Sequence, residues 1–275
     1  VGQTCRMTKS RQAYPTDLND TEWEHIAQYL PAKCSTGAPR TITWREILNG
    51  IFYVVKNGCT WRSLPHDLPK WKTVYHYFRQ FRMQGLWEII NHKIRSAVRQ
   101  AEGREAQASA MIIDSQSAKT AEGGEERGYD GGKKITGRKR NLIVDTLGLV
   151  IKANVTAANV QDVHAGKQTF QLLSEQPEQL TRLQTIFADG GYRGELVTWV
   201  EENLHATLSI VLKKKHQQGF QVLPKRWVIE RTNAWISRSR RLARDYERRV
   251  ASSEAFIYIA MIRICLRRLA SYDEF

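Results

Sequence analysis

The chain has 275 residues, of which 41% are hydrophobic and 9% aromatic, and its formal net charge is +14. This composition is typical of a globular protein with one or two domains and excludes disorder throughout the chain. No apolar run reaches the roughly 20 residues that cross a bilayer, and the first residues lack the apolar segment of a signal peptide. The four cysteines are widely separated, so we expect a reducing cytoplasm rather than a disulfide framework or a structural zinc site.

The charge is unevenly distributed along the chain. Residues 1–104 contain 16 basic and 8 acidic side chains, residues 105–212 contain 11 and 14, and residues 213–249 contain 12 and 3. Two basic segments around an acidic one fit a polyanion that is held at two places near a centre with carboxylates. Two solvated basic faces would give the same counts, so charge alone leaves both interpretations open.

The first hundred residues show helical periodicity. Two helices are predicted to begin at capping boxes, in which a threonine precedes a glutamate by three residues. These boxes are Thr21 with Glu24 and Thr43 with Glu46. The four predicted helices cover residues 21–30, 43–57, 69–85 and 86–99.

The third of these helices has one apolar and one basic polar face. The polar face combines Lys and Arg, which bind phosphates, with Gln, Thr and His, which can read base edges. A helix, a short turn and a helix of this kind are typical of a helix-turn-helix reader, although a plain helical bundle with a basic outer face fits the same pattern. The DNA contacts predicted on this helix are Lys70, Lys72, Arg79 and Arg82.

Beyond residue 104 the pattern changes to strands and helices. Three consecutive strands followed by alternating helices and strands predict a mixed α/β sheet with helices on both faces. A glycine-rich loop is expected over residues 121–137, and a hairpin is expected to turn near Gly148. The predicted strands cover 110–114, 140–146, 149–156, 183–188 and 207–212, and the predicted helices 163–175, 195–203, 224–245 and 252–270.

Three acidic residues stand where a site is expected. Asp114 and Asp189 are each predicted to end a strand, where open α/β sheets place their sites, and Glu230 lies one turn inside a helix. Three carboxylates at one point would repel one another unless a cation neutralised them, and such hard oxygen ligands select Mg²⁺ or Mn²⁺. Each acid alone has an ordinary explanation, because an Asp after a strand is commonly a turn residue and Glu230 could pair with Arg226.

Several blocks of sequence, spread over nearly the whole chain, form a specific combination. The first part contains YPTDLNDTEWEHIAQYLP and TWREILNGIFYVVKNGCTWRSLPHDLPKWKTVYHYFRQFRMQGLW. The second part contains IIDSQSAKT, GRKRNLIVDTLGLV, ANVTAANVQD, FADGGYRG and WVIERTNAWISRSRRLARDYE. In this combination the chain resembles the IS5 family of bacterial insertion-sequence transposases, within the IS4-like DDE transposase superfamily.

The resemblance implies an organisation and an activity. A helical DNA-binding domain over residues 1–104 would recognise terminal inverted repeats, and an RNase H-like catalytic core would follow over residues 105–275. Asp114, Asp189 and Glu230 would be the catalytic acids and would hold two Mg²⁺ or Mn²⁺ ions. Water would first free a 3′-hydroxyl at the transposon end, and this hydroxyl would then attack target DNA. The implied protein acts as a homodimer on double-stranded DNA, in the bacterial cytoplasm with the nucleoid.

The chain departs from the superfamily around its last acid. The superfamily often has a tyrosine seven residues before this acid and a lysine seven residues after it, and here Leu223 and Ser237 stand at these positions. We therefore expect Arg238 or Arg241 to contact the scissile phosphate, from the same sector of a long helix as Glu230. The further predicted DNA contacts are Lys213, Lys214, Lys215, Arg226, Arg238, Arg241 and Arg244.

Some other residues allow two interpretations. Arg138, Lys139 and Arg140 could contact DNA or simply begin a strand. Asp162 is expected to cap a helix rather than to support the active site. Three tryptophans are expected to be core residues rather than platforms for bases, namely Trp199, Trp227 and Trp235.

Two rival functions remain at this stage. The chain could be a domesticated, sequence-specific DNA-binding protein that no longer cuts, or an RNase H-like nuclease without strand transfer. The first predicts that Asp114→Ala changes no activity, whereas the second predicts cutting without inverted-repeat specificity and without joined products.

Overall fold

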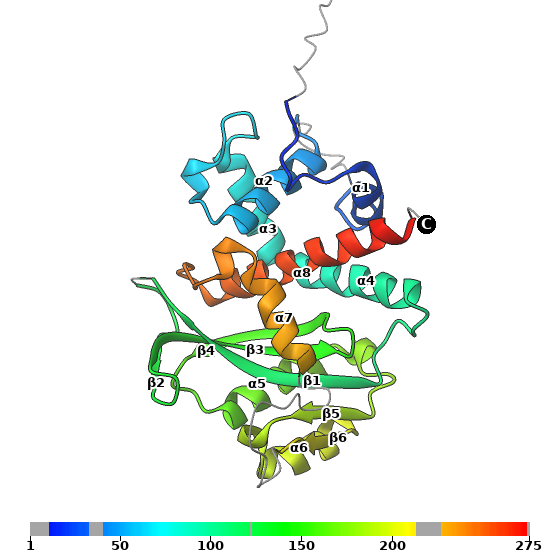
Figure 1. Ribbon diagram of the computed structural model, residues 1–275, viewed down its shortest axis with the longest axis vertical. Helices are drawn as coiled ribbons and strands as arrows, with labels where there is room; N and C mark the ends of the chain where they lie inside the picture. The colour runs from blue at the N-terminus through cyan, green and yellow to red at the C-terminus, as the bar shows by residue number, and fades with distance from the viewer. Residues whose placement is uncertain (1–10, 33–40, 122, 213–226, 274–275) are drawn as a thin grey trace, which may run out of the picture.

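The computed structural model describes residues 11–32, 41–121, 123–212 and 227–273 (Figure 1). Helices α1 to α4 come first, a mixed set of strands and helices follows, and two helices end the described chain. The helices are α1 (Asp20–Ala27), α2 (Trp44–Asn57), α3 (Trp71–Met83), α4 (Leu86–Ala101), α5 (Asp162–Ser174), α6 (Glu195–Leu204), α7 (Trp227–Ser237) and α8 (Val250–Asp273). The strands are β1 (Ala110–Lys119), β2 (Gly128–Asp130), β3 (Ile135–Asp145), β4 (Val150–Ala157), β5 (Thr185–Ala188) and β6 (Thr207–Ile210). Short 3₁₀ turns are η1 (Trp61–Ser63), η2 (Pro177–Gln179), η3 (Gly190–Tyr192) and η4 (Arg240–Leu242).

The strands form one mixed sheet in the order β4–β3–β1–β5–β6, with β2 paired to the first residues of β3. β3 runs antiparallel to both β1 and β4, whereas β5 is parallel to both β1 and β6. The antiparallel strands come first in the chain, and the parallel ones are each preceded by a helix, as parallel connections require. This confirms the predicted mixed α/β sheet and is the order expected of an RNase H-like core.

Helices cover both faces of the sheet, as predicted. Because side chains of a strand alternate between faces, neighbouring residues of β1 belong to different hydrophobic clusters. Ile112 packs in the cluster that contains residues of α7 and α8, whereas Met111 and Ile113 pack in the cluster formed with α5 and α6. The face of α7 and α8 is therefore the face to which even-numbered residues of β1 point.

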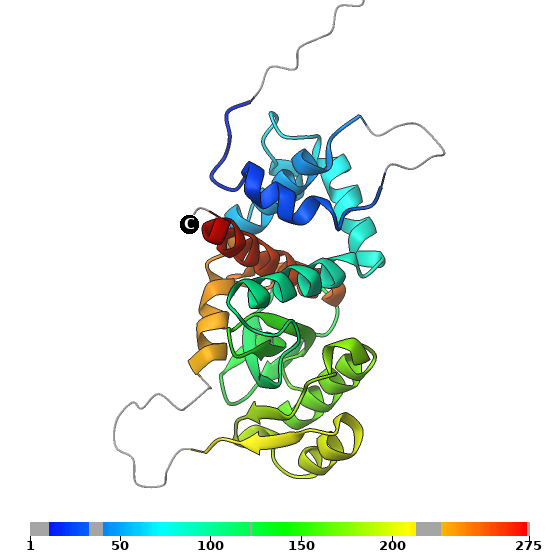
Figure 2. The same ribbon diagram turned by 90° about the vertical axis from the view of Figure 1, so that its right-hand side faces the viewer.

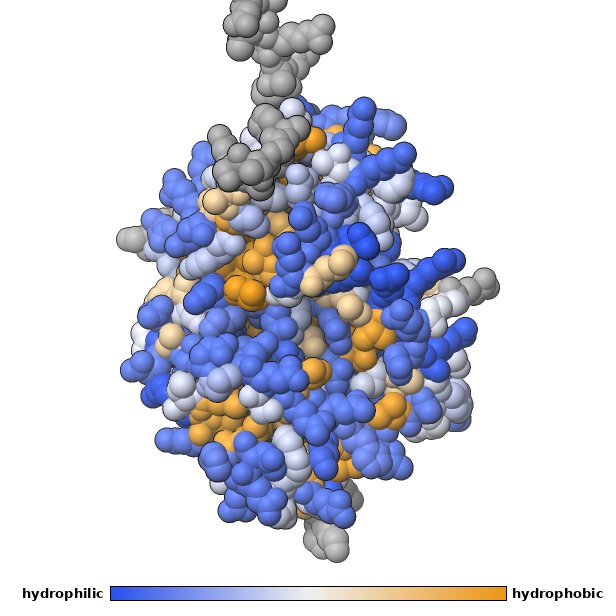
Figure 3. All heavy atoms as spheres, turned by 180° about the vertical axis from the view of Figure 1, so that it is seen from behind, coloured by the Kyte–Doolittle hydropathy of each residue, from blue (hydrophilic) through white to orange (hydrophobic). Residues whose placement is uncertain are grey.

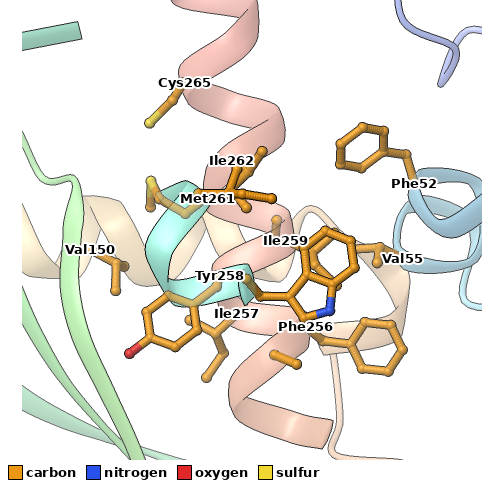
Figure 4. Packing of buried hydrophobic residues seen from close by; sticks show 14 of the residues in the cluster. Phe52, Val55, Val150, Phe256, Ile257, Tyr258, Ile259, Met261, Ile262 and Cys265 are labelled. Atoms are coloured by element: carbon orange, nitrogen blue, oxygen red, sulfur yellow. The ribbon is translucent and has the colours of Figure 1, made fainter. Parts of the chain in front are cut away.

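Helix α8 forms the centre of the larger cluster. It lies with α4 between helices α1–α3 and the sheet (Figure 2). Its side chains reach Phe52 and Val55 of α2 on one side and Val150 of β4 on the other (Figure 4). Most of its apolar side chains are buried, and Phe256 and Ile262 are fully buried.

One hydrophobic cluster thus joins the N-terminal helices to the sheet. It contains residues of α1 to α4 together with residues of α7, α8 and the strands β1, β3 and β4. The predicted division into domains at residue 104 concerns recognition and catalysis and stays a prediction, because the packing is continuous across this point.

The predicted helix starts are partly correct. α2 begins as predicted, with the Thr43 hydroxyl accepting a hydrogen bond from the Glu46 amide, and Gly58 ends it with a positive φ of 73°. The capping box of α1 is not at Thr21 but two residues earlier. There the Asn19 side chain accepts from the Glu22 amide at 2.7 Å, and the Glu22 carboxylate accepts from the Asn19 amide at 3.0 Å.

Two predicted ends in the second half are wrong. β1 does not end at Asp114 but continues to Lys119, because β3 pairs with it along this whole length. The predicted glycine-rich loop accordingly contains β2 and the start of β3. The predicted helix 224–245 ends at Ser237, so Arg238 and Arg241 do not share a helical sector with Glu230. Its residues 224–226 lie outside the described part of the chain.

Seen from the side opposite to Figure 1, the surface is mainly hydrophilic, and its apolar side chains form separate patches (Figure 3). Within the described residues, no helix combines the length and the apolar character that crossing a membrane requires.

Candidate functional site

Asp114 lies on β1, and Asp189 directly follows the neighbouring parallel strand β5. Ile112 pairs with Phe187 at the end of this ladder, so Asp114 and Asp189 each stand two residues beyond its last pair. Ile112 and Phe187 pack in the cluster of α7 and α8, and the alternation of side chains along β1 turns Asp114 toward the same face as Ile112. The sequence prediction that these two acids meet at one edge of the parallel pair is thus consistent with the sheet register.

Backbone amides orient both carboxylates. The amide of Ser115 donates to Asp114 Oδ1 at 2.8 Å, and the amide of Gly191 donates to Asp189 Oδ1 at 2.8 Å. Asp189 is the N-cap of the short turn η3, which leaves β5 at this point. Both carboxylates are half-buried, which lowers the local dielectric around them without removing access from solvent.

Asp162 is a further acid near this pair and does not cap a helix as predicted. It is the first residue of α5, and Gln161 stands in the cap position without a side-chain cap bond. Its carboxylate instead accepts from the Ser115 hydroxyl and the Lys139 ammonium, both at 2.9 Å. A methyl group at Gly191 would lie 3.1 Å from Asp189 Oδ1 and 3.3 Å from Asp162 Oδ2, so the two carboxylates are neighbours. In the sequence, only its place in the block ANVTAANVQD indicated that Asp162 stands near the other two aspartates.

The buried ring of Tyr192 lies among these acids. Burial raises the pKa of its hydroxyl well above the ordinary value for tyrosine. The negative charges of Asp114, Asp162 and Asp189 raise this pKa further. The hydroxyl is therefore held in its neutral form beside the acidic cluster.

Glu230 lies on α7, the helix that packs on the face of β1 to which Asp114 points. It is exposed, whereas its neighbours Val228 and Ile229 are buried against the sheet. Two contacts tie α7 to the turn of the β3–β4 hairpin. Arg231 donates to the Leu147 carbonyl at 2.9 Å, and the Thr232 hydroxyl donates to the Gly148 carbonyl at 2.7 Å.

The three predicted acids are suited to a divalent ion by their donor chemistry, because each offers hard carboxylate oxygens. Asp114 lies on β1, Asp189 directly after β5 and Glu230 on α7. In the part of the chain that the structure describes, however, no three histidine, cysteine, aspartate or glutamate side chains stand close enough to hold a metal ion. The three acids therefore do not form such a cluster within the described residues, and their fit to a divalent ion rests on the chemistry of their carboxylate oxygens.

A basic groove lies between α3 and the segment that follows η4. Its volume is about 560 Å³, and aromatic rings, among them the exposed Tyr75 and Tyr246, alternate in its lining with arginines. Its single acidic lining residue, Glu247, is already paired with Arg241 at 2.6 Å. Arginines beside exposed rings are typical of surfaces that hold a nucleic-acid backbone and its bases. The lining arginines are Arg62, Arg82, Arg241, Arg248 and Arg249.

The residues predicted to contact DNA differ in their exposure. Lys70, Lys72 and Arg79 on and next to α3 are exposed, as are Arg238 and Arg244 after α7. Arg82 is half-buried and donates to the Ser252 hydroxyl. Arg241 is largely buried, since its guanidinium binds Glu247 and the Cys59 carbonyl. Four of the predicted contacts lie outside the described residues, namely Lys213, Lys214, Lys215 and Arg226.

The cluster Arg138, Lys139 and Arg140 belongs to a strand and not to a DNA-binding surface. All three side chains are buried in β3. Arg138 donates to the carbonyls of Glu247 and Arg248, and Arg140 donates to the carbonyl of Leu242. These bonds hold the segment between η4 and α8 against the sheet.

The three tryptophans divide between core and surface. Trp199 packs partly buried against the cluster of α5 and α6, as predicted. Trp227 is 42% exposed, so the prediction of a core residue is wrong there. The Arg231 guanidinium lies 4.5 Å from the ring centres of both Trp227 and Trp235, which places it between them.

Comparisons with known proteins identify the family of the chain. Residues 105–265, more than half of the chain, match the family described as "Transposase DDE domain". Residues 18–91 match the family described as "Putative transposase of IS4/5 family". A curated relative from Burkholderia cepacia, the "Putative transposase for insertion sequence element IS402", is 30% identical over 145 residues, which are 50% of this chain and 67% of the relative.

Proposed function

The chain belongs to the transposase DDE domain family and is a transposase of the IS4/5 type, and we propose that it cuts and joins DNA at the ends of its insertion sequence. It binds the terminal inverted repeats, cleaves the DNA strands there with divalent metal ions and transfers them into target DNA. The observation that supports this proposal is the parallel pairing of β1 with β5, because Asp114 and Asp189 each stand two residues beyond its last pair.

The aspartates have the leading role in this proposal. Asp114 and Asp189 hold the divalent ions, and Glu230 from α7 provides the third carboxylate. Divalent ions bound there supply the positive charge that activates an attacking oxygen and stabilises the leaving oxygen of a phosphodiester. The amides of Ser115 and Gly191 keep both aspartates oriented, so little reorganisation is needed when DNA binds.

The DNA path in this proposal follows the basic groove and the exposed face of α3. Lys70, Lys72 and Arg79 contact phosphates or bases from α3, while Arg82 and Arg241 lie in the groove itself. The arginines of the groove attract the phosphates, and its exposed rings offer stacking surfaces. Because two transposon ends must be cut and joined together, the protein acts as a homodimer on DNA.

One experiment tests the whole proposal. The protein is incubated with Mg²⁺ and DNA that carries the ends of its own element, and the products are sequenced. We expect cleavage at the inverted repeats and joined products. The variants Asp114→Asn, Asp189→Asn and Glu230→Gln should each lose roughly 100-fold or more in cleavage rate, while DNA affinity is kept within about twofold. Glu201→Gln, an exposed glutamate on α6, is the matched control and should cleave like the wild type.

The rival functions give different products. A DNA-binding protein that no longer cuts would retard the inverted repeats but give no Mg²⁺-dependent products in any variant. A nuclease without strand transfer would cut unrelated DNA equally well and would give no joined products. Light scattering of the complex with DNA of the inverted repeats separates a dimer from a monomer.

A further inference from the structure

A second basic pocket lies between α2, the end of α7 and α8. Its volume is about 320 Å³, and we name it the α2–α8 pocket. None of the three predicted catalytic acids lines it, and its described lining contains no acidic side chain. Five cationic side chains converge on it, namely Lys56, Arg238, Arg263, Arg267 and Arg268.

Most of this positive charge is not neutralised within the described part of the chain. Arg263 is paired with Glu22 from α1. Arg267 donates to the backbone carbonyl of Pro15, and Lys56 donates to the backbone carbonyl of Arg238, neither of which removes a charge. The pocket therefore keeps a strong positive potential, which its apolar floor, with Phe52 and other side chains, strengthens by lowering the dielectric.

The indole ring of Trp235 contacts two arginines, one of which, Arg268, lines the pocket. The guanidinium of Arg268 lies 4.7 Å from the centre of the Trp235 ring, and the guanidinium of Arg231 lies 4.5 Å from the same centre. Burial lowers the pKa of Arg231, and the positive charge of Arg268 lowers it further. A stacked guanidinium keeps its N–H donors along its edge, so the ring holds Arg268 in an orientation suited to a planar or tetrahedral anion. A bound anion would relieve the repulsion between the two arginines.

The pocket continues the basic surface that the proposed function assigns to DNA. Arg238, which precedes the short turn η4, lines the pocket, and Arg241, within this turn, lines the basic groove. The segment 238–241 thus contributes side chains to both the pocket and the groove. A ligand with several phosphates in a row can occupy both, whereas a single small anion cannot.

We infer that the α2–α8 pocket binds a phosphate group of the DNA backbone, outside the region of strand cleavage. This inference rests on the proposed function, because it assigns the phosphate to the same DNA. Arg267 and Arg268 donate to the phosphate oxygens, Arg238 approaches from the end of α7, and Trp235 keeps Arg268 in place. The contact is independent of base sequence and fixes the position of the helical region on the DNA.

The test compares two double variants that lose the same charge. Arg267→Gln with Arg268→Gln removes two donors from the pocket. Arg104→Gln with Arg182→Gln removes two exposed arginines that line neither the pocket nor the groove. Affinity for a labelled duplex of the element's end is measured by fluorescence anisotropy between about 50 and 200 mM salt. Thermal unfolding of each variant verifies folding, and the single variant Arg238→Gln, whose side chain is exposed, repeats the test if the double variant unfolds.

The outcome is decided by how the DNA affinity of each variant depends on salt concentration. Loss of one phosphate contact reduces the slope of log K against log salt by about 1, so the pocket variant should lose roughly 1 unit of slope and about tenfold in affinity. The control variant should keep the wild-type slope. A pocket variant with the wild-type slope, or a control variant with an equal loss, overturns the inference.

Two further comparisons complete the test. One distinguishes DNA from a free anion as the ligand, and the other distinguishes a failure of this inference from a failure of the proposed function. Calorimetry with inorganic tripolyphosphate measures binding of a free anion. If tripolyphosphate binding depends on Arg267 and Arg268 while the DNA slope does not, the pocket serves a free anion and the assignment to DNA is wrong. If the DNA slope changes as expected but the wild type gives no cleaved or joined products, the proposed function fails and the pocket assignment is kept.

Discussion

The hydroxyl group of Thr232 donates a hydrogen bond to the carbonyl oxygen of Gly148 at 2.7 Å, and this contact joins α7 to the β3–β4 hairpin. Thr232 is fully buried, and Gly148 has a positive φ of 81°, which glycine adopts without strain. A methyl group at Gly148 would lie 2.7 Å from the Thr232 hydroxyl oxygen. Because Glu230 is two residues away, the same contact fixes where α7 carries this carboxylate.

We expect Gly148→Ala to lower the free energy of unfolding by roughly 2–5 kcal/mol, because alanine is strained at this φ and also collides with Thr232. Gly103→Ala is the matched control. Gly103 has a similar φ of 67°, but no described atom lies within 4 Å of an added methyl group, so the loss should be only about 1–2 kcal/mol. Urea denaturation measures both values. Equal losses would show that the contact with Thr232 adds nothing to the strain.

Replacing Thr232 itself tests whether the contact positions Glu230. Thr232→Val keeps the shape but loses the hydroxyl, and we expect a roughly tenfold slower single-turnover cleavage with DNA affinity unchanged, since a shifted helix misplaces the carboxylate. Thr232→Ser retains the hydroxyl and should cleave at nearly the wild-type rate. A valine variant that is less stable but cleaves normally would assign Thr232 a purely structural role.

The sequence predicted most elements because their signals are local. Residues 44–57 have a capping threonine, a helical stripe of apolar residues and a terminal glycine, and α2 begins and ends accordingly. The C-terminal end of α7 had no such signal. Residues 238–244 are compatible with a helix, but Arg138 and Arg140 on β3 take up the carbonyls of the segment 242–248. These bonds come from residues about a hundred positions away, so no local pattern could reveal them.

The candidate site, too, could be predicted from local signals but not from contacts between distant residues. The residues Asp114 and Asp189 could be selected because each follows an apolar run, and the register of β1 with β5 is consistent with their meeting. The length of β1 beyond Asp114 could not be predicted, because it depends on pairing with β3. The position of Glu230 relative to the aspartates depends on how α7 packs on the hairpin turn, which is a tertiary property. The resemblance to insertion-sequence transposases is confirmed by the family matches.

The packing around Phe256 predicts that this residue contributes strongly to the free energy of unfolding. Phe256 is fully buried, and its ring stacks on Phe78 of α3 at 4.8 Å between centres. We expect Phe256→Ala to lower the free energy of unfolding by roughly 3–5 kcal/mol, because the cavity lies where the helical region meets α8. Met83→Ala, at a residue that is 65% exposed, is the control and should change it by less than about 0.5 kcal/mol. A small effect at Phe256 would show that the two regions do not depend on this contact.

Glu254 on α8 makes the stability depend on pH. Burial raises the pKa of this carboxyl from 4.5 to about 7, although its hydrogen bond from the Val155 amide at 2.9 Å acts in the opposite direction. The negative charge of Glu88 raises the pKa further, and the positive charge of Lys152 lowers it. Between pH 4.5 and 7 the native state therefore keeps a proton that the unfolded chain has already lost.

Stability from this proton is full below pH 4.5 and is lost as the pH rises through 7. The maximum loss is about 3 kcal/mol, since one pKa unit corresponds to about 1.4 kcal/mol. Glu254→Gln cannot ionise and keeps an oxygen that accepts the Val155 hydrogen bond, so we expect it to be more stable than the wild type at pH 8 and nearly equal at pH 4.5. Urea denaturation across this range measures the difference, with the exposed Glu201→Gln as the control that should follow the wild type. If the difference between Glu254→Gln and the wild type did not change with pH, the pKa of Glu254 would be the same in the folded and unfolded protein, and burial would not raise it.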